Sequence, residues 1–331
     1  MAAARKAKRA GEFALIERYF RPLATSPGAF GLLDDAALYS PPAGEELVLT
    51  VDTVAAGVHF FADDPPASIA RKALRVNLSD LAAKGARPAG YLMSLALPDG
   101  WTEKWIRDFA KGLEEDQRSY AIGLLGGDTT RASGGLTVSI TAIGCVPKGK
   151  MVRRAGARPG DAVFVSGTIG DAGLGLAIRL GKIAAPDNGA RYLRDRYLHP
   201  QPRLTLAPLL RRFANSAMDV SDGLVGDLAH ICEASGVGGT IEVANVPLSR
   251  EAKAVVAGND AALMTVLTGG DDYEILATVA ETRTAKFAAE AASAGVPVAR
   301  IGRILAGKGP PVVHGADGKP LALSGLGHTH F

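Results

Sequence analysis

The chain has 331 residues, of which 47% are hydrophobic, and its formal net charge is +3 at pH 7. The length predicts about two domains with apolar cores, and the charge is too small to indicate nucleic-acid binding. No run of 18 apolar residues predicts a membrane span, and the first 30 residues lack the apolar stretch of a secretory signal. The two cysteines, Cys145 and Cys232, are far apart, so we expect a reducing, cytoplasmic compartment and no disulfide framework.

The first part of the chain predicts an α/β domain over residues 11–147, after a basic, solvated tail over residues 1–10. Strands and helices alternate along it, which is typical of an α/β architecture. The expected elements are a helix over 12–23, a strand over 47–52, a helix over 68–84, a strand over 91–97, a helix over 103–120 and strands over 122–125 and 136–145.

A loop rich in Gly, Pro and Arg near residues 147–160 predicts the boundary with a second α/β domain over residues 148–331. The tail from residue 307 is expected to be irregular. The expected elements are a strand over 162–166, helices over 173–180 and 204–213, an apolar segment over 216–219, a helix over 224–234, strands over 240–243 and 274–279, a helix over 283–294 and a strand over 298–304.

The most informative pattern is a set of six apolar runs that each stop at aspartate beside small or turn-forming residues. Aspartate is unfavourable inside a strand, and ligands of open α/β sheets bind at the carboxyl ends of strands. Clustered carboxylates would repel one another by about 4 kcal/mol per close pair at an effective dielectric constant of about 20. Oxygen-only ligand sets favour Mg²⁺, which usually bridges to substrate phosphates. The runs end at Asp34 and Asp35, Asp52, Asp80, Asp128, Asp219 and Asp222, and Asp271 and Asp272.

Simpler interpretations of these and other motifs stay open. Asp34 and Asp35 suit a turn, and Asp222 could cap the helix that follows it. Residues 144–151 almost match a phosphate-binding loop, but Met151 stands where Ser or Thr must hold Mg²⁺, so we interpret them as a connector. Residues 166–175 resemble a dinucleotide turn without its glycine order, and a structural turn fits them equally well. The position of His59, seven residues after Asp52, suits either a structural role or a functional one.

Taken together, the motifs resemble the thiamine-monophosphate kinase family of the aminoimidazole-ribonucleotide-synthetase-like superfamily. They follow the family order from residue 11 to about residue 305, and as a set they are highly specific. The matching segments are 11–16, 33–37, 51–60, 76–86, 126–131, 154–161, 219–224 and 269–274.

The resemblance implies direct in-line transfer of the ATP γ-phosphate to thiamine monophosphate, which yields thiamine diphosphate, with several Mg²⁺ ions as cofactors. It implies an α/β (α+β) fold of two domains. The N-terminal sheets of two subunits would pair into a shared barrel, so the expected partners are the two substrates and a second copy of the chain. Phosphoryl transfer needs positioning and charge neutralisation more than covalent help, which agrees with the aspartate pattern.

The resemblance also implies roles position by position. The implied catalytic residues are Asp52, Asp128 and Asp219. The implied metal positions are Asp35, Thr50, Val51 (through its carbonyl), Asp52, Asp80, Asp128, Asp219 and Asp222. The implied ATP contacts are Gly127, Asp128, Arg154 and Ser221, and the implied substrate contacts are His59, Asp271 and Leu326.

Two positions depart from the family pattern. Asp271 stands where the family usually has Glu, and Leu326 stands where it has an aromatic residue against the thiamine. We expect Leu326 or the terminal Phe331 to close over the thiamine ring. Two other functions stay open: another ATP-using enzyme of the superfamily, or a non-catalytic nucleotide or thiamine-phosphate binding protein. The siblings would need a reactive cysteine near a terminus, where neither Cys145 nor Cys232 lies, and the second alternative predicts loss of the carboxylates.

Overall fold

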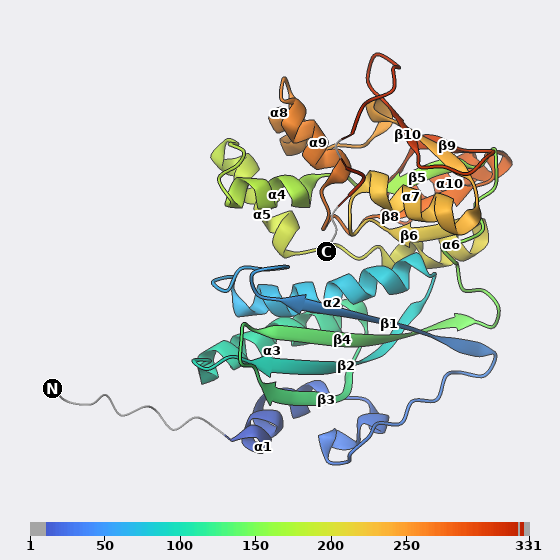
Figure 1. Ribbon diagram of the computed structural model, residues 1–331. Coiled ribbons are helices and arrows are strands. Elements are labelled where there is room, and N and C mark those ends of the chain that lie inside the picture. Colours follow the sequence, from blue (N-terminus) through green and yellow to red (C-terminus); the bar gives the residue numbers. More distant parts are fainter. Residues whose placement is uncertain (1–10, 324, 328–331) are drawn as a thin grey trace. The chain divides into compact units, whose positions relative to one another are not determined.

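The structure is a computed structural model that describes residues 11–323 and 325–327 (Figure 1). The chain forms two compact units. The first contains residues up to Ala43, Leu49–Asn77 and Pro88–Gly144, and the second contains Gly44–Val48, Leu78–Arg87 and the chain from Cys145 onward. Within the described residues, none of the helices is both long enough and apolar enough to cross a membrane. The domain boundary after residue 147 stays a prediction.

The first unit is built on a four-stranded sheet with the order β1-β4-β2-β3 (Figure 1). Strands β2 and β3 are parallel, and Ser94 is paired with Asp128. Helix α3 begins at the N-cap Thr102, whose side chain accepts a hydrogen bond from Trp105 N at 3.1 Å, and it buries an apolar stripe that includes Phe109. The strands are β1 (Glu45–Ala55), β2 (Arg87–Leu97), β3 (Leu124–Arg131) and β4 (Thr137–Pro147), and the long helices are α2 (Pro66–Ala83) and α3 (Glu103–Tyr120).

The helix expected over residues 12–23 forms as three short consecutive helical segments. They are α1 (Glu12–Leu15), the π-helix η1 (Ile16–Phe20) and the 3₁₀ helix η2 (Arg21–Leu23), followed by the 3₁₀ segment η3 (Pro27–Leu32). Pro22 lies in η2, where its missing N–H ends the regular hydrogen-bond pattern.

One face of the first sheet carries apolar side chains that remain open to solvent. Leu49 and Val51 of β1 are 64% and 60% exposed, and Leu92 of β2 is 38% exposed. Val48 and Val54 of β1 are buried. Successive residues of a strand point to opposite faces, so this sheet is buried on one side only within the chain.

The second unit has a six-stranded sheet with the order β10-β7-β9-β5-β8-β6. All neighbours are antiparallel except β10 and β7, which are parallel. The strands are β5 (Ala162–Ser166), β6 (Ala214–Asp219), β7 (Gly238–Glu242), β8 (Ile275–Val279), β9 (Val298–Leu305) and β10 (Val312–His314). The helices are α4 (Asp171–Arg179), α5 (Asp187–Leu198), α6 (Ala207–Phe213), α7 (Leu224–Ser235), α8 (Arg250–Val256), α9 (Asp260–Thr268) and α10 (Thr284–Ser293), with 3₁₀ segments η4 (Leu204–Leu206), η5 (Val243–Asn245) and η6 (Glu281–Arg283).

Strand β5 shows why the second sheet is covered on both faces (Figure 1). Val163 and Val165 belong to a core shared with α4, α7 and α9. Ala162 and Phe164 point the other way, into a core shared with α6 and α10. A strand buried on both faces has a continuous apolar sequence, and all five residues of β5 are buried.

The expectation that strands end at the aspartates is wrong at Asp52, which lies inside β1, and at Asp128, which lies inside β3 rather than in a turn. Asp219 does end β6, and Asp80 lies in α2, which agrees with the helix expected over residues 68–84. A sheet that is open on one face accepts polar residues at alternate positions, so a strand does not have to stop at its aspartate. Helices α5, α8 and α9 and strand β10 were not expected from the sequence.

Candidate functional site

In the first unit, a cavity of about 730 Å³ brings together two loop aspartates and the Gly-Gly-Asp segment of β3. Its lining includes Asp34, Asp35, Gly127 and Asp128. The Asp34 carboxylate accepts a hydrogen bond from Asp35 N at 2.8 Å. Asp34 is therefore a turn-forming residue, in which the side chain bonds to the local backbone. Gly127 is required by the packing, because a Cβ there would lie 1.9 Å from Met93 O.

Strand β1 carries the next group of expected residues, which are Thr50, Val51 and Asp52. Asp52 N donates to Asn77 Oδ1 at 3.0 Å, and the Asn77 amide in turn donates to Ala73 O at 3.0 Å, so a buried asparagine fixes the backbone at Asp52. The amide of Asn77 therefore positions the strand that carries Asp52.

The His59 ring lies against the end of β1. Its Nδ1 accepts a hydrogen bond from Ala55 N at 3.1 Å, which sets Nε2 as the protonated nitrogen of the neutral ring. The buried Lys72 donates from Nζ to His59 O at 2.8 Å. The backbone and the ring of His59 are both held, so the structural interpretation of this residue is supported while its substrate contact stays a prediction.

In the second unit, Asp80 and Asp219 form a repelling pair beside a lysine. Burial, and next the charge of Asp80, raise the pKa of Asp219 well above its usual range. Burial lowers the pKa of Lys84, although Asp219 and Asp80 oppose the shift, and the nearby charge of Arg154 lowers it further. Lys84 Nζ donates to Ala217 O at 3.0 Å. The structure therefore brings four charged groups together, three of which were expected site residues.

Two loops of the second unit run side by side and bring together the expected contacts Ser221, Asp222 and Asp271. Asp271 N donates to Ser221 O at 2.9 Å, and Tyr273 N donates to Val220 O at 2.8 Å. Asp271 and Tyr273 have φ angles of 73° and 52°, in the left-handed region that non-glycine residues rarely adopt. Backbone strain of this kind is common at functional sites and persists only where the surroundings fix it.

Buried charged side chains anchor the second of these loops. Asp272 accepts from Gly170 N at 2.6 Å and from Ala172 N at 3.2 Å, and burial raises the pKa of Asp272 well above its usual range. The amides that begin α4 are thus occupied by Asp272, which favours the structural interpretation of the turn at 166–175. Glu274 accepts hydrogen bonds from Ser166, Arg196 and Arg203.

Asp227, which the sequence interpretation missed, organises the first of these loops. Its Oδ2 accepts from the backbone N of Ser221 at 3.0 Å, Asp222 at 3.1 Å and Gly223 at 3.2 Å. Burial, and next the charge of Asp222, raise the pKa of Asp227 to about 7. The N-cap of α7 is Gly223, without a side-chain cap, so the alternative that Asp222 caps this helix is wrong. The signal in the sequence was an acidic residue in the first turn of a helix that follows a Ser-Asp-Gly loop.

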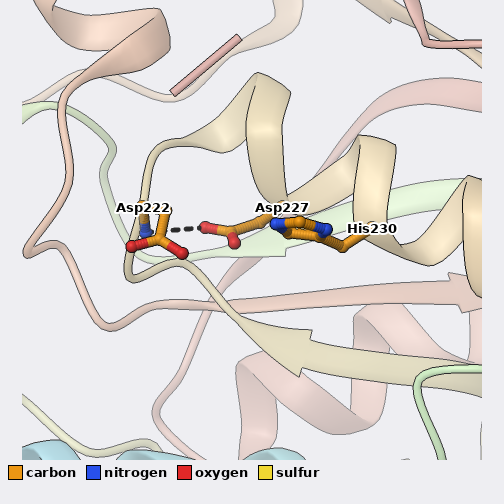
Figure 2. A group of neighbouring side chains, drawn as sticks. All are labelled: Asp222, Asp227 and His230. Atoms are coloured by element: carbon orange, nitrogen blue, oxygen red, sulfur yellow. Dashed lines mark hydrogen bonds between the residues drawn. The ribbon is translucent and has the colours of Figure 1, made fainter. Parts of the chain in front are cut away.

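Ligand atoms of Asp222, Asp227 and His230 lie within 4.8 Å of one another (Figure 2). Figure 2 shows the Asp227 carboxylate between the Asp222 carboxylate and the His230 ring, with the hydrogen bond from Asp222 N to Asp227 as a dashed line. Two carboxylates and an imidazole are chemically able to hold a divalent cation.

The expected thiamine contact Leu326 lies beside the same loop. The Leu326 side chain is 42% exposed, while Leu326 O would lie 3.1 Å from a Cβ on Gly226. A Cβ on Gly327 would lie 2.8 Å from Asp222 O, so this part of the tail runs directly over the loop that carries Asp222. Phe331 lies outside the described residues.

Two family models match the chain in sequence. The AIR synthase related protein N-terminal domain matches residues 33–146, and the AIR synthase related protein C-terminal domain matches residues 158–315. Together they cover most of the chain. Hydrogenase maturation protein HypE in complex with ATP is similar in fold, with a TM-score of 0.79 at 22% identity.

More similar relatives extend over nearly the whole chain. The thiamine-monophosphate kinase of Caulobacter vibrioides is 42% identical over 96% of this chain and 90% of the relative, and that of Escherichia coli K12 is 42% identical over 97% and 98%. The crystal structure of the enzyme from Stenotrophomonas maltophilia K279a has a TM-score of 0.82 at 42% identity and covers 94% of this chain and 98% of its own. The structure of AaThiL complexed with AMPPCP and TMP has a TM-score of 0.76 at 32% identity and covers 96% and 97%. The chain belongs to the thiamine-monophosphate kinase family.

Proposed function

We propose that the chain transfers the γ-phosphate of ATP to thiamine monophosphate at carboxylates that hold Mg²⁺. The buried Asp219 beside Asp80 carries this proposal, because two such carboxylates repel each other and a divalent cation removes the repulsion. The relatives named thiamine-monophosphate kinase, and the related structure complexed with AMPPCP and TMP, support the choice of substrates. Because ATP is a cytoplasmic co-substrate, we expect the protein to act in the cytoplasm.

The donor set fits Mg²⁺. The candidate ligands are carboxylates with main-chain and hydroxyl oxygens, which are the hard ligands that Mg²⁺ prefers. When bound, Mg²⁺ would neutralise charge on the ATP tail and on the transferred group. The residues that would hold it are Asp80, Asp219 and Asp222 in the second unit, and Asp35, Thr50, Val51, Asp52 and Asp128 in the first.

The chain's own residues would then position the reactants for a direct, in-line transfer. The phosphate of thiamine monophosphate is already anionic, so no strong general base is needed and no phosphoenzyme is expected. Arg154 is exposed and can make a forked contact with a phosphate. The backbone N–H of Ser221 is taken by Asp227 and its carbonyl by Asp271, so we assign an ATP contact of Ser221 to its hydroxyl.

Recognition of the thiamine half is assigned to His59, Asp271 and the tail. Asp271 is one methylene shorter than the family's usual Glu, so it reaches less far toward the substrate. Leu326 offers exposed apolar surface where the family has an aromatic ring. We propose that apolar contact with Leu326 replaces ring stacking, which is worth about 0.5–1.5 kcal/mol beyond the buried area.

We also propose a homodimer formed through the open face of the first sheet. Leu49 and Val51 of β1 and Leu92 of β2 expose apolar surface on a sheet whose other face is buried, and such surfaces mark interfaces. Light scattering should give twice the monomer mass of 34.2 kDa at micromolar concentration. Leu49→Lys should shift the mass toward the monomer, whereas the matched exposed leucine change Leu180→Lys in the second unit should not. A monomeric wild-type protein would contradict the dimer.

The activity is tested by ATP-dependent turnover with thiamine monophosphate, with product detection by chromatography. Thiamine diphosphate should form in proportion to ADP, and unphosphorylated thiamine should not replace the acceptor. ATP consumption without thiamine diphosphate would point to another enzyme of the superfamily. Binding of both ligands without turnover would point to a non-catalytic binding protein.

A further inference from the structure

We propose that Asp222, Asp227 and His230 form a divalent-cation site with one nitrogen ligand, which takes Zn²⁺, Co²⁺ or Mn²⁺ in preference to Mg²⁺. The family resemblance implies a metal at Asp222 but no role for Asp227 or His230. Asp222 is shared with the carboxylates proposed to hold Mg²⁺, so the two cations would compete for this residue. The inference otherwise rests on the three side chains themselves and does not depend on kinase activity.

The first observation is an unpartnered oxygen on Asp227. The side chain is fully buried, and its Oδ2 is saturated by three backbone N–H groups. Its Oδ1 is also buried and has no hydrogen-bond partner among the described residues. Buried carboxylate oxygens in folded proteins almost always have a partner, so this atom points to a ligand that the protein chain does not supply.

The second observation is the arrangement of the other two side chains. Asp227 and His230 are three residues apart on α7, so they lie on the same face of the helix. Figure 2 shows the Asp227 carboxylate flanked by Asp222 on one side and by the His230 ring on the other. The three ligand atoms lie within 4.8 Å of one another, and ligands held about 2.0–2.3 Å from one ion are about 3–4.5 Å apart. Small side-chain rotations would therefore close the site around a single cation.

The chemistry of the donors selects the class of cation. Two carboxylates and a neutral imidazole give the site a charge of −2, which a divalent cation neutralises. Imidazole suits Zn²⁺, Co²⁺ and Mn²⁺ better than Mg²⁺, which prefers oxygen ligands and retains its water. His230 is exposed, so solvent can supply the remaining ligands. The positive end of the α7 dipole opposes a cation here, but Asp227 already occupies the loop amides that would otherwise face the ion.

A cation at this position would tie the loop of Ser221, Asp222 and Gly223 to the first turns of α7. Asp227 Oδ2 holds the amides of that loop, while Oδ1 would hold the ion. One carboxylate would then fix the loop backbone and the ion together.

The test is a Zn²⁺ titration of the full-length protein followed by ¹⁵N NMR of labelled histidine rings. It is done in excess Mg²⁺, which fills oxygen-only sites and which Zn²⁺ must displace at Asp222. The His230 signals, assigned with His230→Gln, should shift and saturate at one equivalent of Zn²⁺. His314 is the matched control because its Nδ1 lies 2.9 Å from a carboxylate oxygen of Glu242, yet within the described part of the chain it belongs to no group of three possible metal ligands. A parallel sample with His328→Gln and His330→Gln removes two other histidines that could take up Zn²⁺.

The acidic ligands are tested with Asp222→Asn and Asp227→Asn, each of which should weaken Zn²⁺ binding at His230 at least tenfold, whereas His314→Gln should leave it unchanged. The His314 signals report whether each variant is folded. If Asp227→Asn does not fold, Asp222→Asn decides the matter, because the loop hydrogen bonds use its backbone N–H. The proposal fails if Zn²⁺ shifts His230 no more than His314, or if both Asn variants that fold retain the wild-type affinity.

Discussion

The carboxylates of the two units differ in how strongly burial and charge repulsion disfavour their ionised forms when no ligand is bound. Asp128 lies on an exposed part of β3 and lines an open cavity, where water solvates its charge. Asp219 is only 6% exposed and lies beside Asp80, so its ionised form is opposed by both burial and repulsion. A solvated aspartate is compatible with many roles, whereas a buried aspartate in a repelling pair requires a partner. The second unit, with its buried Asp219, therefore gives the stronger argument for a bound cation.

The largest expected effect is a loss of stability when the buried charge network of the second unit is broken. Glu274→Gln should lower the free energy of unfolding by about 3–5 kcal/mol, because the buried Arg196 and the partly buried Arg203 would lose the carboxylate that they share. Within the described residues, Arg196 would retain only its longer contact of 3.8 Å with Asp171. Chemical denaturation at pH 7 measures the change. Asp99→Asn, which removes an exposed ion pair with Arg131 in the first unit, should change stability little. Equal effects of the two changes would contradict the contrast between the units.

A second pair of variants separates function from stability. Asp128→Asn and Asp219→Asn should each lower kcat at least about 100-fold, since one lost metal ligand removes several kcal/mol of charge stabilisation. In the metal-free protein, Asp219→Asn should raise the free energy of unfolding, because a buried, repelled carboxyl is removed. Asp128→Asn should leave it nearly unchanged. Steady-state kinetics measures kcat, and denaturation in the presence of a chelator measures the free energy of unfolding. Normal turnover of either variant at limiting Mg²⁺ would contradict a metal-binding role of the substituted aspartate.

The pH dependence of the free energy of unfolding tests whether Asp227, another buried carboxylate of the second unit, also has a disfavoured ionised form. Its pKa in the folded protein is about 7, against an ordinary value of 3.8. Between these pH values the folded state retains a proton that the unfolded state has lost, so the contribution of Asp227 to stability falls as pH rises from about 4 to about 7. The loss cannot exceed about 1.4 kcal/mol per pH unit. Denaturation in a chelator should show this slope in the wild type and not in Asp227→Asn; parallel curves would contradict the shift.

The smallest expected effect concerns the thiamine contact. Leu326→Ala should raise KM for thiamine monophosphate about threefold to tenfold and leave KM for ATP unchanged, since only apolar contact with the ring is lost. Steady-state kinetics with each substrate varied in turn provides the measurement. Deletion of His330 and Phe331 is the companion variant. If only the deletion raises KM, the terminal residues hold the ring, and if neither change matters, the ring is bound near His59 or Asp271.

Much of the fold followed from local patterns in the sequence. The helix over residues 103–120 and the strand over 162–166 agree with α3 and β5, because an amphipathic stripe and a continuous apolar run are strong signals. Helix α5 was missed since its sequence, Asp187–Leu198, is rich in charge and begins with an Asn-Gly turn signal. Its buried Leu193 and Tyr197 become meaningful only once α4 packs against them.

The site was less accessible from the sequence. The Asp-rich motifs indicated which residues to examine, and the structure brings Asp80 to Asp219 and Ser221 to Asp271. The role of Asp227 was not visible, because it depends on the loop at residues 221–223 folding back onto the first turn of α7. The hydrogen-bond partners of the buried Glu274 are residues 71 to 108 positions away along the chain, a separation that no local pattern encodes.

The left-handed backbone at Asp271 limits which acidic residues the position can accept. At a φ of 73°, short side chains such as Asp and Asn are tolerated better than longer ones, because their polar groups can bond locally to the backbone. Restoring the family's Glu with Asp271→Glu would lengthen the reach toward the substrate but place a less tolerant residue on a strained backbone. An engineer who transfers the family residue into this chain should therefore expect better reach only together with a less stable loop. Tyr273 can be varied in the same library, but Gly270 should be kept, because a Cβ there would lie 2.2 Å from Ser221 O.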